Sequence, residues 1–522
     1  MFLYQQGFLM KRFGALFFAA LLTAVCGIGT AQESPTPENT IYLGSSRDLF
    51  IDDHLIASME NVELLVHHPE RKELTFIFDQ PWEGDGQNYF TVFQDDEKYR
   101  MYYHAWGQFP SRPLTIAYAE SDDGLHWVRP SLGICSFNGS KENNIVLDKV
   151  ADSVECHDFN PFWDRKPGTS PDAKYKAVGF GWSTDPAKNG LYAWKSPDAV
   201  HWTRIRDTPV LTNAPFDTQN VAFWSQLEQC YVLYYRHFRG GVDVNAGTRI
   251  ILKATSDDMI HWTPQGEIEF PEGEGPRHDA QFYTNQILPY YRAPQLYIGF
   301  PARYVDRGVN ETTKLLPGWE ARQKRIAQEQ RLGTTVTDSV FISSRDGLHF
   351  RQSSDVFVKP GLRTDHNWCY GDNYLAWNVV ETASLDDDSP RELSIFSVES
   401  YQTGGESRLR RYALRIDGFS SLHANSRAGT VVTKPIIFEG KELSLNVSTS
   451  AAGLVRVELL NADGSEIPGF NADDCDPIYG DSLDRRVTWK SNADLSAFAG
   501  KPIVLRFYLV EADIYSLQWV TP

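Results

Sequence analysis

Short apolar and aromatic runs, each bounded by polar turn residues, follow one another along most of the chain. Runs of this length, rich in Val, Ile, Tyr, Phe and Trp, are typical of β-strands. They also come in pairs, which indicates successive antiparallel strands. The sequence predicts strand pairs over 89–93 with 99–103, 221–225 with 231–235, 281–288 with 295–300, and 374–380 with 393–399.

A seven-residue motif, Ser-x-Asp-x-x-His-aromatic, punctuates these runs four times. Its copies occupy residues 121–127, 196–202, 256–262 and 344–350, at intervals of 75, 60 and 88 residues. Each copy follows a β-rich run, and its Asp suits a tight turn because Asp tolerates left-handed backbone and bonds its own backbone. The motif therefore predicts a hairpin that recurs with the fold. Its histidines are assigned to structure, and its aromatics to packing between units: His126, His201, His261 and His349.

Repetition at this spacing fits four-stranded units with loops of variable length. A fifth, degenerate unit has 411–416 in place of the hairpin. The sequence thus predicts an all-β protein, with a five-bladed β-propeller over residues 45–420. Asp48–Asp52 is the strand expected to close the ring. A charged helix is predicted in an insertion near 306–334 within the fourth blade, either as a solvated surface helix or as a lid over the central pocket.

The repeat pattern stops after about residue 420, and a separate set of predicted strands follows. Asn461-Ala-Asp-Gly within this set is a hairpin turn signal. Residues 425–522 are therefore predicted to form a C-terminal β-sandwich, an accessory domain packed on the propeller.

Residues 1–31 read as a secretory signal peptide, with Lys11 and Arg12 before an apolar run that is too short to be a permanent anchor. A lipoprotein signal at Cys26 is the alternative, against which Val25 argues. The protein is expected to be secreted or periplasmic. A formal charge of −18 argues against nucleic acid or an anionic membrane as partners. The five cysteines of the mature chain lack a C-x-x-C motif; a Cys135–Cys156 bridge and free buried thiols both remain open.

Polar and acidic residues precede each predicted inner strand, and in a propeller these positions converge on one mouth. Carboxylates there could perform acid–base chemistry, amides could bridge hydroxyls, and aromatic rings could stack on sugars. The residues so placed point to a carbohydrate as the partner. The candidate catalytic acids are Glu83, Asp85, Asp158 and Asp217, and the candidate substrate contacts are Asn88, His157, Asn160, Gln219, Asp279, Tyr283, Asn285, Arg303 and Asp372.

Through the hairpin motif and the acids before the inner strands, residues 45–420 resemble the five-bladed propeller glycoside hydrolases of families 32, 43 and 68. They are most similar to secreted bacterial proteins described as "glycosyl hydrolase family 32 N-terminal domain-like". The resemblance implies an acid in each of the first three blades: Glu83 or Asp85, then Asp158, then Asp217. The Asn-Asp-Pro-Asn nucleophile motif of family 32 is absent, and His157-Asp158-Phe159 and Phe216-Asp217-Thr218 stand where that family has Arg-Asp-Pro and Glu-Cys.

The leading hypothesis is a glycoside hydrolase that cleaves a poly- or oligosaccharide with carboxylates in the propeller channel and needs no cofactor. A structural calcium ion in the channel is a further expectation that the acids leave open. The alternative is a non-catalytic glycan-binding propeller. A propeller transferase or phosphorylase, with Arg277 and Arg303 serving an anion, is the third interpretation.

Overall fold

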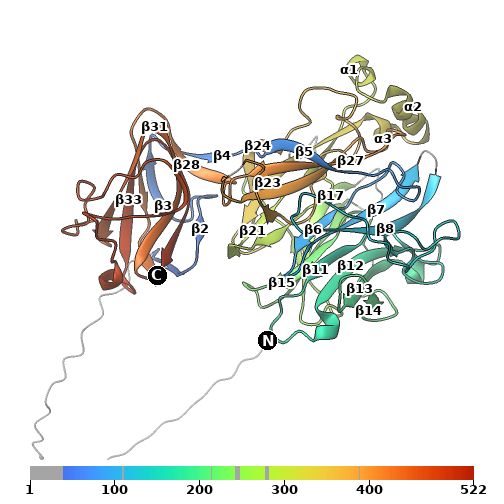
Figure 1. The fold of residues 1–522 in the computed structure, drawn as a ribbon, viewed down its shortest axis with the longest axis horizontal. Coiled ribbons are helices and arrows are strands. Elements are labelled where there is room, and N and C mark those ends of the chain that lie inside the picture. The colour runs from blue at the N-terminus through green and yellow to red at the C-terminus, as the bar shows by residue number, and fades with distance from the viewer. Residues whose placement is uncertain are drawn as a thin grey trace, which may run out of the picture.

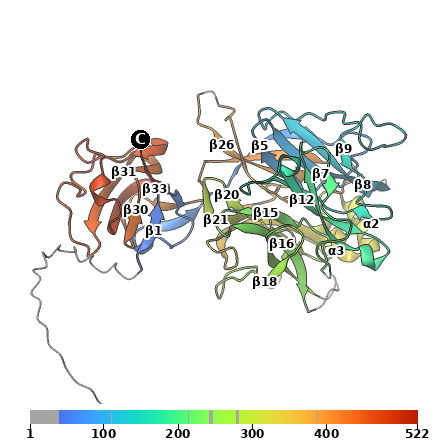
Figure 2. The same ribbon diagram turned by 90° about the horizontal axis from the view of Figure 1, so that it is seen from below.

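The computed structural model describes residues 39–521, apart from 109–110, 213, 241–246, 277–280 and 387. The predicted signal peptide and Asp279 lie outside these residues. The described chain forms two β-rich lobes that lie side by side, a large propeller and a smaller domain that contains the C-terminus (Figures 1 and 2). None of the described helices is long and apolar enough to cross a membrane.

Five separate antiparallel sheets form the five blades of the propeller, which confirms the predicted architecture. The strands of blades one to three are β6 (Thr91–Gln94), β7 (Tyr99–Gln108), β8 (Ser111–Ser121) and β9 (Ile145–Leu147); β10 (Glu155–Cys156), β11 (Asn160–Trp163), β12 (Tyr175–Trp182), β13 (Gly190–Ser196) and β14 (Thr203–Arg204); and β15 (Val221–Ser225), β16 (Cys230–Arg239), β17 (Thr248–Ser256) and β18 (Thr263–Glu267). Short 3-10 turns at Pro171–Ala173 and Pro186–Lys188 connect strands of blade two.

Blades four and five depart from the four-strand pattern in different ways. Blade four has six strands: β19 (Gln281–Phe282), β20 (Leu288–Tyr290), β21 (Ala293–Gly299), β22 (Ala302–Asp306), β23 (Thr335–Ser344) and β24 (Arg351–Val358). Blade five contains β25 (Val380–Thr382), β26 (Glu392–Glu399), β27 (Arg408–Leu414) and, from the start of the chain, β5 (Glu70–Ile77).

The ring is closed by β5, which pairs antiparallel with β27. The prediction that Asp48–Asp52 closes it is wrong, because β2 (Asp48–Leu49) pairs with a strand of the other domain. Asp48 and Asp52 instead receive the guanidinium of Arg345, at 2.8–3.0 Å. The strand that closes the ring thus comes about twenty residues later in the chain than expected.

The repeated motif forms the predicted hairpin in all four copies. In the first copy, Asp123 Oδ1 accepts hydrogen bonds from the backbone N–H groups of Leu125 and His126, both at 2.8 Å, and Asp123 Oδ2 lies 2.7 Å from His126 Nδ1. These contacts recur around Asp198, Asp258 and Asp346. The aromatic that ends the motif packs on a neighbouring blade, as Trp202 of blade two does against Tyr102 of blade one. Structural roles for the motif are therefore confirmed.

The smaller domain is one ten-stranded sheet with a core of its own. Four of its strands come from before the propeller, so the expected start of the propeller at residue 45 is too early. The early strands are β1 (Ile41–Gly44), β2, β3 (Ile56–Glu60) and β4 (Glu63–Val66); the late ones are β28 (Ser420–Ala424), β29 (Gly429–Thr433), β30 (Ile436–Phe438), β31 (Glu442–Asn461), β32 (Asp481–Arg486) and β33 (Ile503–Val520). A single 3-10 turn, Ser496–Phe498, precedes β33. The β-sandwich arrangement remains a prediction.

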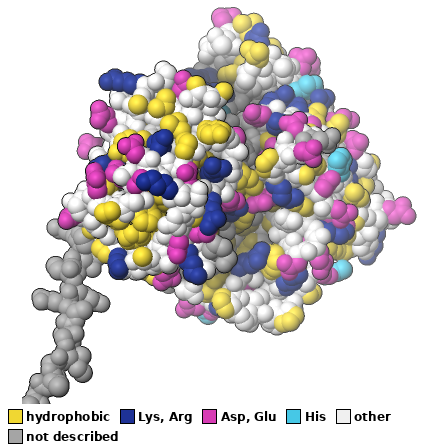
Figure 3. All heavy atoms as spheres, turned by 60° about the vertical axis from the view of Figure 1, so that its left-hand side comes forward, with side chains coloured by type: hydrophobic (Ala, Val, Ile, Leu, Met, Phe, Trp, Pro, Cys, Tyr) yellow, Lys and Arg dark blue, Asp and Glu magenta, His cyan; other side chains and the backbone are white. Residues whose placement is uncertain are grey.

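Buried charges join the two domains. Asp417, at the end of blade five, is fully buried and lies 3.1 Å from Arg47 of the smaller domain and 3.0 Å from Arg292 of blade four. On the face seen in Figure 3, acidic and basic side chains are interspersed rather than gathered by sign.

The five cysteines of the described chain are free thiols, so the Cys135–Cys156 bridge does not form.

The insertion in blade four is helical, as predicted. It contains α1 (Glu311–Lys314), α2 (Trp319–Gln328) and α3 (Gln330–Thr334), between β22 and β23. These helices cover one corner of the propeller (Figure 1). The expectation of a merely solvated helix is wrong for one face of α2, because Arg322 and Arg325 are buried there.

Candidate active site

A cavity of about 210 Å³ lies at the end of the propeller axis where the inner strands begin. Blades one, four and five contribute aromatic side chains to its walls, blade two contributes a histidine, and the segment of blade three that precedes β15 contributes an acid. The lining residues are Asn88, Tyr89, His104, Trp106, Leu114, His157, Asp217, Tyr283, Leu332, Tyr370, Tyr374, Tyr401 and Gln402. The sequence-predicted residues that the structure brings together here are Asn88, His157, Asp217 and Tyr283.

Asp217 and His157 form an ion pair at the cavity wall, although they belong to different blades. His157 Nε2 lies 2.7 Å from Asp217 Oδ1, and the second carboxylate oxygen lies 3.6 Å from Arg236 Nη2. The Asp217 side chain is 52% exposed, and His157 is 32% exposed. Asp217 is therefore the carboxylate that a molecule in this cavity would meet.

The surroundings of this pair favour the charged form of each group. Burial opposes the charge of Asp217, but His157, Arg236 and Arg249 outweigh that cost and hold the pKa of this carboxyl well below its usual range. Burial likewise lowers the pKa of His157, but the neighbouring Asp217 carboxylate more than offsets it and leaves the pKa raised. The wall thus presents an ionised carboxylate beside an imidazole whose protonated form this carboxylate favours.

Tyrosines form most of the remaining wall. Tyr283 stacks on Tyr374 with ring centroids 5.3 Å apart and on Tyr304 at 5.7 Å. Behind this stack, the guanidinium groups of Arg236 and Arg249 lie 5.4 and 5.2 Å from the ring centre of Tyr283. Flat aromatic walls of this kind suit the apolar faces of sugar rings.

Several polar atoms that line the cavity are buried without a hydrogen-bond partner in the described protein. They are Asn88 Oδ1, His104 Nε2, Trp106 Nε1 and the Tyr374 hydroxyl. Burial lowers the pKa of His104 well below its usual value, with the nearby His157 adding to the effect, so this imidazole is neutral. Unpaired buried polar groups are costly, and their gathering around one cavity indicates a polar ligand that would satisfy them.

The helical insertion supplies one wall of the cavity through Leu332 of α3. Arg322 and Arg325 of α2 fix this wall by donating to backbone carbonyls: Arg322 to Pro317, Gly333 and Trp368, and Arg325 to Leu332 and Gln402. Since Gln402 and Leu332 both line the cavity, the insertion is part of the site, as the lid alternative requires.

The prediction that acids from several blades face one cavity is wrong for four of the five described carboxylates. Glu83 is fully buried, and its carboxylate accepts hydrogen bonds of 2.6–2.9 Å from the Tyr103 hydroxyl, the Arg129 guanidinium and the Gln80 N–H. Asp85, also buried, accepts a hydrogen bond from the Gly404 N–H at 3.1 Å. Neither lines the cavity, since both anchor loops beside it.

Asp158 and Asp372 are likewise internal. Asp158 accepts hydrogen bonds from the backbone N–H of Phe180 and from the backbone and side-chain N–H groups of Asn220, and burial raises its pKa to about 7. Asp372 accepts from the N–H groups of Cys369 and Tyr401, and burial raises its pKa to about 7 as well. These carboxylates tie loops and blades together and do not reach the cavity.

The amides predicted as substrate contacts fill the channel instead. Gln219 donates to Phe90 O and Thr91 Oγ1, both at 3.0 Å, and Asn160 donates to Thr91 Oγ1 at 3.0 Å. Asn285 is buried and accepts from the Ile287 N–H at 3.1 Å. Arg303, the remaining contact in the described chain, forms a two-pronged ion pair with Asp338, both contacts being 2.7 Å. These expectations are therefore wrong.

Sequence reasoning missed much of the aromatic wall. Tyr370 and Tyr374 stand within the polar segment that precedes the inner strand of blade five, and the alternation of Tyr102, His104 and Trp106 along β7 gave a signal for the wall of blade one. Tyr401, Gln402 and Leu332 lie in a loop and in the insertion, where no repeat marks them. In the described chain no group of three or more His, Cys, Asp or Glu side chains could hold a metal ion.

No protein-family model matches the chain, and no curated protein matches it. Solved structures with a similar arrangement include an N-acetylgalactosamine deacetylase from F. plautii (11% identity, 67% of this chain and 94% of that one, TM-score 0.43). Others are a family 32 β-fructofuranosidase from Bombyx mori (9%, 86% and 95%, TM-score 0.40) and a glycosyl hydrolase from Bacteroides ovatus (12%, 67% and 94%, TM-score 0.41). Likeness this distant carries no information about chemistry.

Proposed function

We propose that the protein is a glycoside hydrolase that acts at the tyrosine-lined cavity, with Asp217 as its catalytic carboxylate. The observation that carries the proposal is the ionised, half-exposed Asp217 in a cavity whose other walls are aromatic rings and unpaired polar atoms. Carboxylate, stacking surface and hydrogen-bonding groups are the three features that sugar hydrolysis requires.

Asp217 would act as the base that activates water, or as the nucleophile that attacks the anomeric carbon. His157 is a positioning residue, since its 2.7 Å contact orients the carboxylate and keeps it ionised. A second carboxyl group has to protonate the leaving oxygen. Among the described lining residues Asp217 is the one acid, so Asp279, before the inner strand of blade four, is the candidate for that role.

The absence of a second acid among the described lining residues also favours the alternative, a propeller that binds glycans without cleaving them. Under either proposal the ligand is a carbohydrate. Export from the cytoplasm by the predicted signal peptide would bring the protein into contact with poly- or oligosaccharides.

The test is to incubate the protein with a panel of poly- and oligosaccharides and to measure hydrolysis by the reducing ends that appear. Asp217→Asn is expected to lower turnover by about 10²–10⁴-fold while sugar affinity is retained. His126→Gln is the matched control, since this variant removes a histidine from an Asp–His pair of the same 2.7 Å geometry on an exposed hairpin. Sugar binding without turnover in the parent protein would instead establish the non-catalytic alternative.

A separate variant tests the proton donor. Asp279→Asn is expected to slow the cleavage of unactivated glycosides, while aryl glycosides with acidic leaving groups, which need little protonation, remain substrates. Equal losses on both substrate types would contradict this role.

A further inference from the structure

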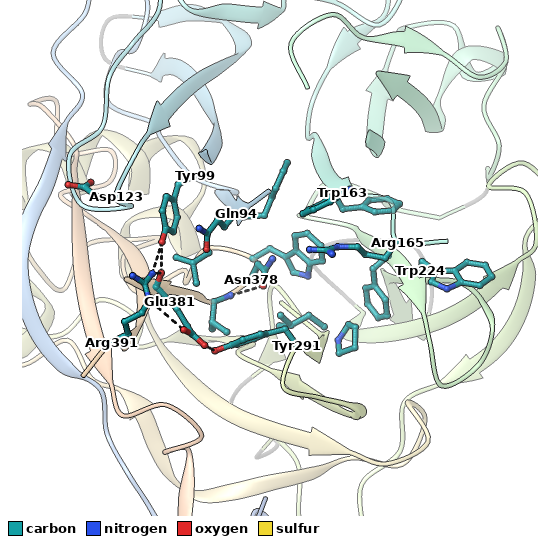
Figure 4. A pocket seen from close by; sticks show the side chains of 18 of the residues that line it. Gln94, Tyr99, Asp123, Trp163, Arg165, Trp224, Tyr291, Asn378, Glu381 and Arg391 are labelled. Atoms are coloured by element: carbon teal, nitrogen blue, oxygen red, sulfur yellow. Dashed lines mark hydrogen bonds and ion pairs between the residues drawn. The ribbon is translucent and has the colours of Figure 1, made fainter. Parts of the chain in front are cut away.

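A second and larger cavity, of about 760 Å³, opens at the opposite end of the propeller axis (Figure 4). All five blades contribute to it, through the ends of their inner strands and the loops that follow. Its lining combines aromatic side chains with amides and charged groups, and ten of these residues are labelled in Figure 4: Gln94, Tyr99, Asp123, Trp163, Arg165, Trp224, Tyr291, Asn378, Glu381 and Arg391.

The two cavities are separated by the amides that fill the channel. Gln286 donates to Gln219 Oε1 at 2.8 Å and to Leu375 O at 2.7 Å, and Gln219 donates in turn to Thr91. Trp377, whose indole N–H donates to Ile287 O at 2.9 Å, lies on the side of the second cavity. The cavities share no lining residue, so a ligand of one does not touch the other.

The second cavity has positively charged side chains at its blade-two side. The guanidinium carbon of Arg165 lies 3.4 Å from the ring centre of Trp163, and Lys174 Nζ lies 5.5 Å from the same ring. Within the described chain neither side chain forms a hydrogen bond or an ion pair. A guanidinium stacked on an indole keeps its N–H edge free, and that edge matches the paired oxygens of a carboxylate or sulfate.

Two acids, Asp96 and Asp95, attract the charge of Arg165, but neither forms an ion pair with it within the described chain. Asp95 is buried and receives Arg100 and the Tyr175 hydroxyl. Glu381, across the cavity, receives the Tyr291 hydroxyl and lies 3.6 Å from Arg391. Asp123 lies on the far side of the cavity from Arg165, where it pairs with His126 (Figure 4). In a protein with a net charge of −18, a guanidinium that lines a cavity without an ion-pair partner in the described chain is an anion-binding feature.

The rest of the lining suits a sugar. Tyr291 leaves 47% of its surface exposed, and the amides of Gln94 and Asn378 also line the cavity, Gln94 beside Tyr99 (Figure 4). Asn378 Oδ1 accepts from the Val379 N–H, which leaves its NH₂ group free to donate to a hydroxyl. We propose that this cavity binds an anionic oligosaccharide, whose uronate carboxylate or sulfate ester pairs with Arg165.

Calorimetric titration of the Asp217→Asn protein with size-matched uronate, sulfated and neutral oligosaccharides tests the proposal without turnover. The uronate or the sulfated sugar, or both, should bind, with an affinity that falls as salt is added. Arg165→Gln should weaken this binding about tenfold or more and leave the neutral sugar unaffected. Which anionic sugar responds identifies the group that Arg165 recognises.

Arg206→Gln is the matched control, because Arg206 is an exposed arginine of the same blade whose one hydrogen bond within the described chain is to Thr208. It should bind as the parent does. Failure of every anionic oligosaccharide to bind, or equal affinity in Arg165→Gln and its parent, would overturn the proposal. Turnover at Asp217 is measured separately. Binding at the second cavity without hydrolysis can therefore be distinguished from hydrolysis without binding at the second cavity.

Discussion

Asp158 and Asp217 precede the inner strands of neighbouring blades, 59 residues apart, and look equivalent along the chain. In the structure they are opposites. Asp158 is fully buried, accepts three hydrogen bonds, and has a pKa raised to about 7 by that burial. Asp217 is half exposed, and neighbouring cations lower its pKa.

Their distance from the strand explains the difference. Asp158 stands two residues before β11 and Asp217 stands four residues before β15. Asp158, closer to its strand, lies between blades and accepts from backbone N–H groups and from the Asn220 side chain. Asp217, farther from its strand, remains at the cavity wall. The comparison teaches that a repeat fixes which segment reaches the mouth but not which residue of that segment faces a ligand.

The largest effect is expected on the free energy of unfolding, measured with denaturant, when each carboxylate is removed in turn. Asp158→Ala leaves buried N–H groups of Phe180 and Asn220 without an acceptor, and should cost about 3 kcal/mol. Asp217→Ala removes a half-exposed group and should cost less than about 1 kcal/mol. Equal losses for the two variants would break the comparison.

The pH dependence of stability should distinguish the two acids next. The folded-state pKa of Asp158, about 7, lies above its unfolded value of 3.8, so its contribution is most favourable below pH 3.8 and is lost as pH rises through about 7. Asp158→Asn should therefore flatten the fall in unfolding free energy between pH 4 and 7. The lowered pKa of Asp217 has the opposite sign, with stability lost as pH falls below 3.8. If the unfolding free energy of Asp158→Asn fell with pH as steeply as that of the parent, the pH dependence would not come from Asp158.

A pH–rate profile sharpens the account of Asp217 itself. In the parent, the acid limb should lie below the ordinary carboxyl pKa, because His157 and the two arginines favour the ionised form. His157→Gln removes one of these cations and should move the limb upward, toward the ordinary pKa of an aspartate. A loss of kcat with an unmoved limb would show that His157 does not act through the charge of Asp217.

The smallest effect is expected at the hairpins. His126 is 84% exposed, and its pairing with Asp123 is one of four repeated copies. Its replacement by Gln should change the unfolding free energy by less than about 0.5 kcal/mol, because Asp123 still accepts the backbone N–H groups of the turn. A shift in melting temperature of several degrees would show that the pair stabilises the blade.

The propeller could be predicted because its signals are local: each hairpin motif bonds its own backbone, so it looks the same in every blade. The ring closure by β5 could not, because it depends on pairing between residues 70–77 and 408–414, which leaves no local mark. For the site, the repeat located Asp217 and His157. The repeat could not show that Glu83 differs from them, because Glu83 pairs with Arg129, which lies 46 residues away in the chain.

The strands that precede the propeller complete the sheet that follows it, and β5 completes blade five. Neither lobe can therefore be excised by one cut: a fragment beginning at residue 425 would lack β1 to β4 and β28, and a fragment ending at 420 would leave β1 to β4 with unsatisfied edges. A circular permutant that starts at β5 and links residue 521 to β1 would keep every strand pair, and it would make the smaller domain, β28 to β33 followed by β1 to β4, one continuous segment.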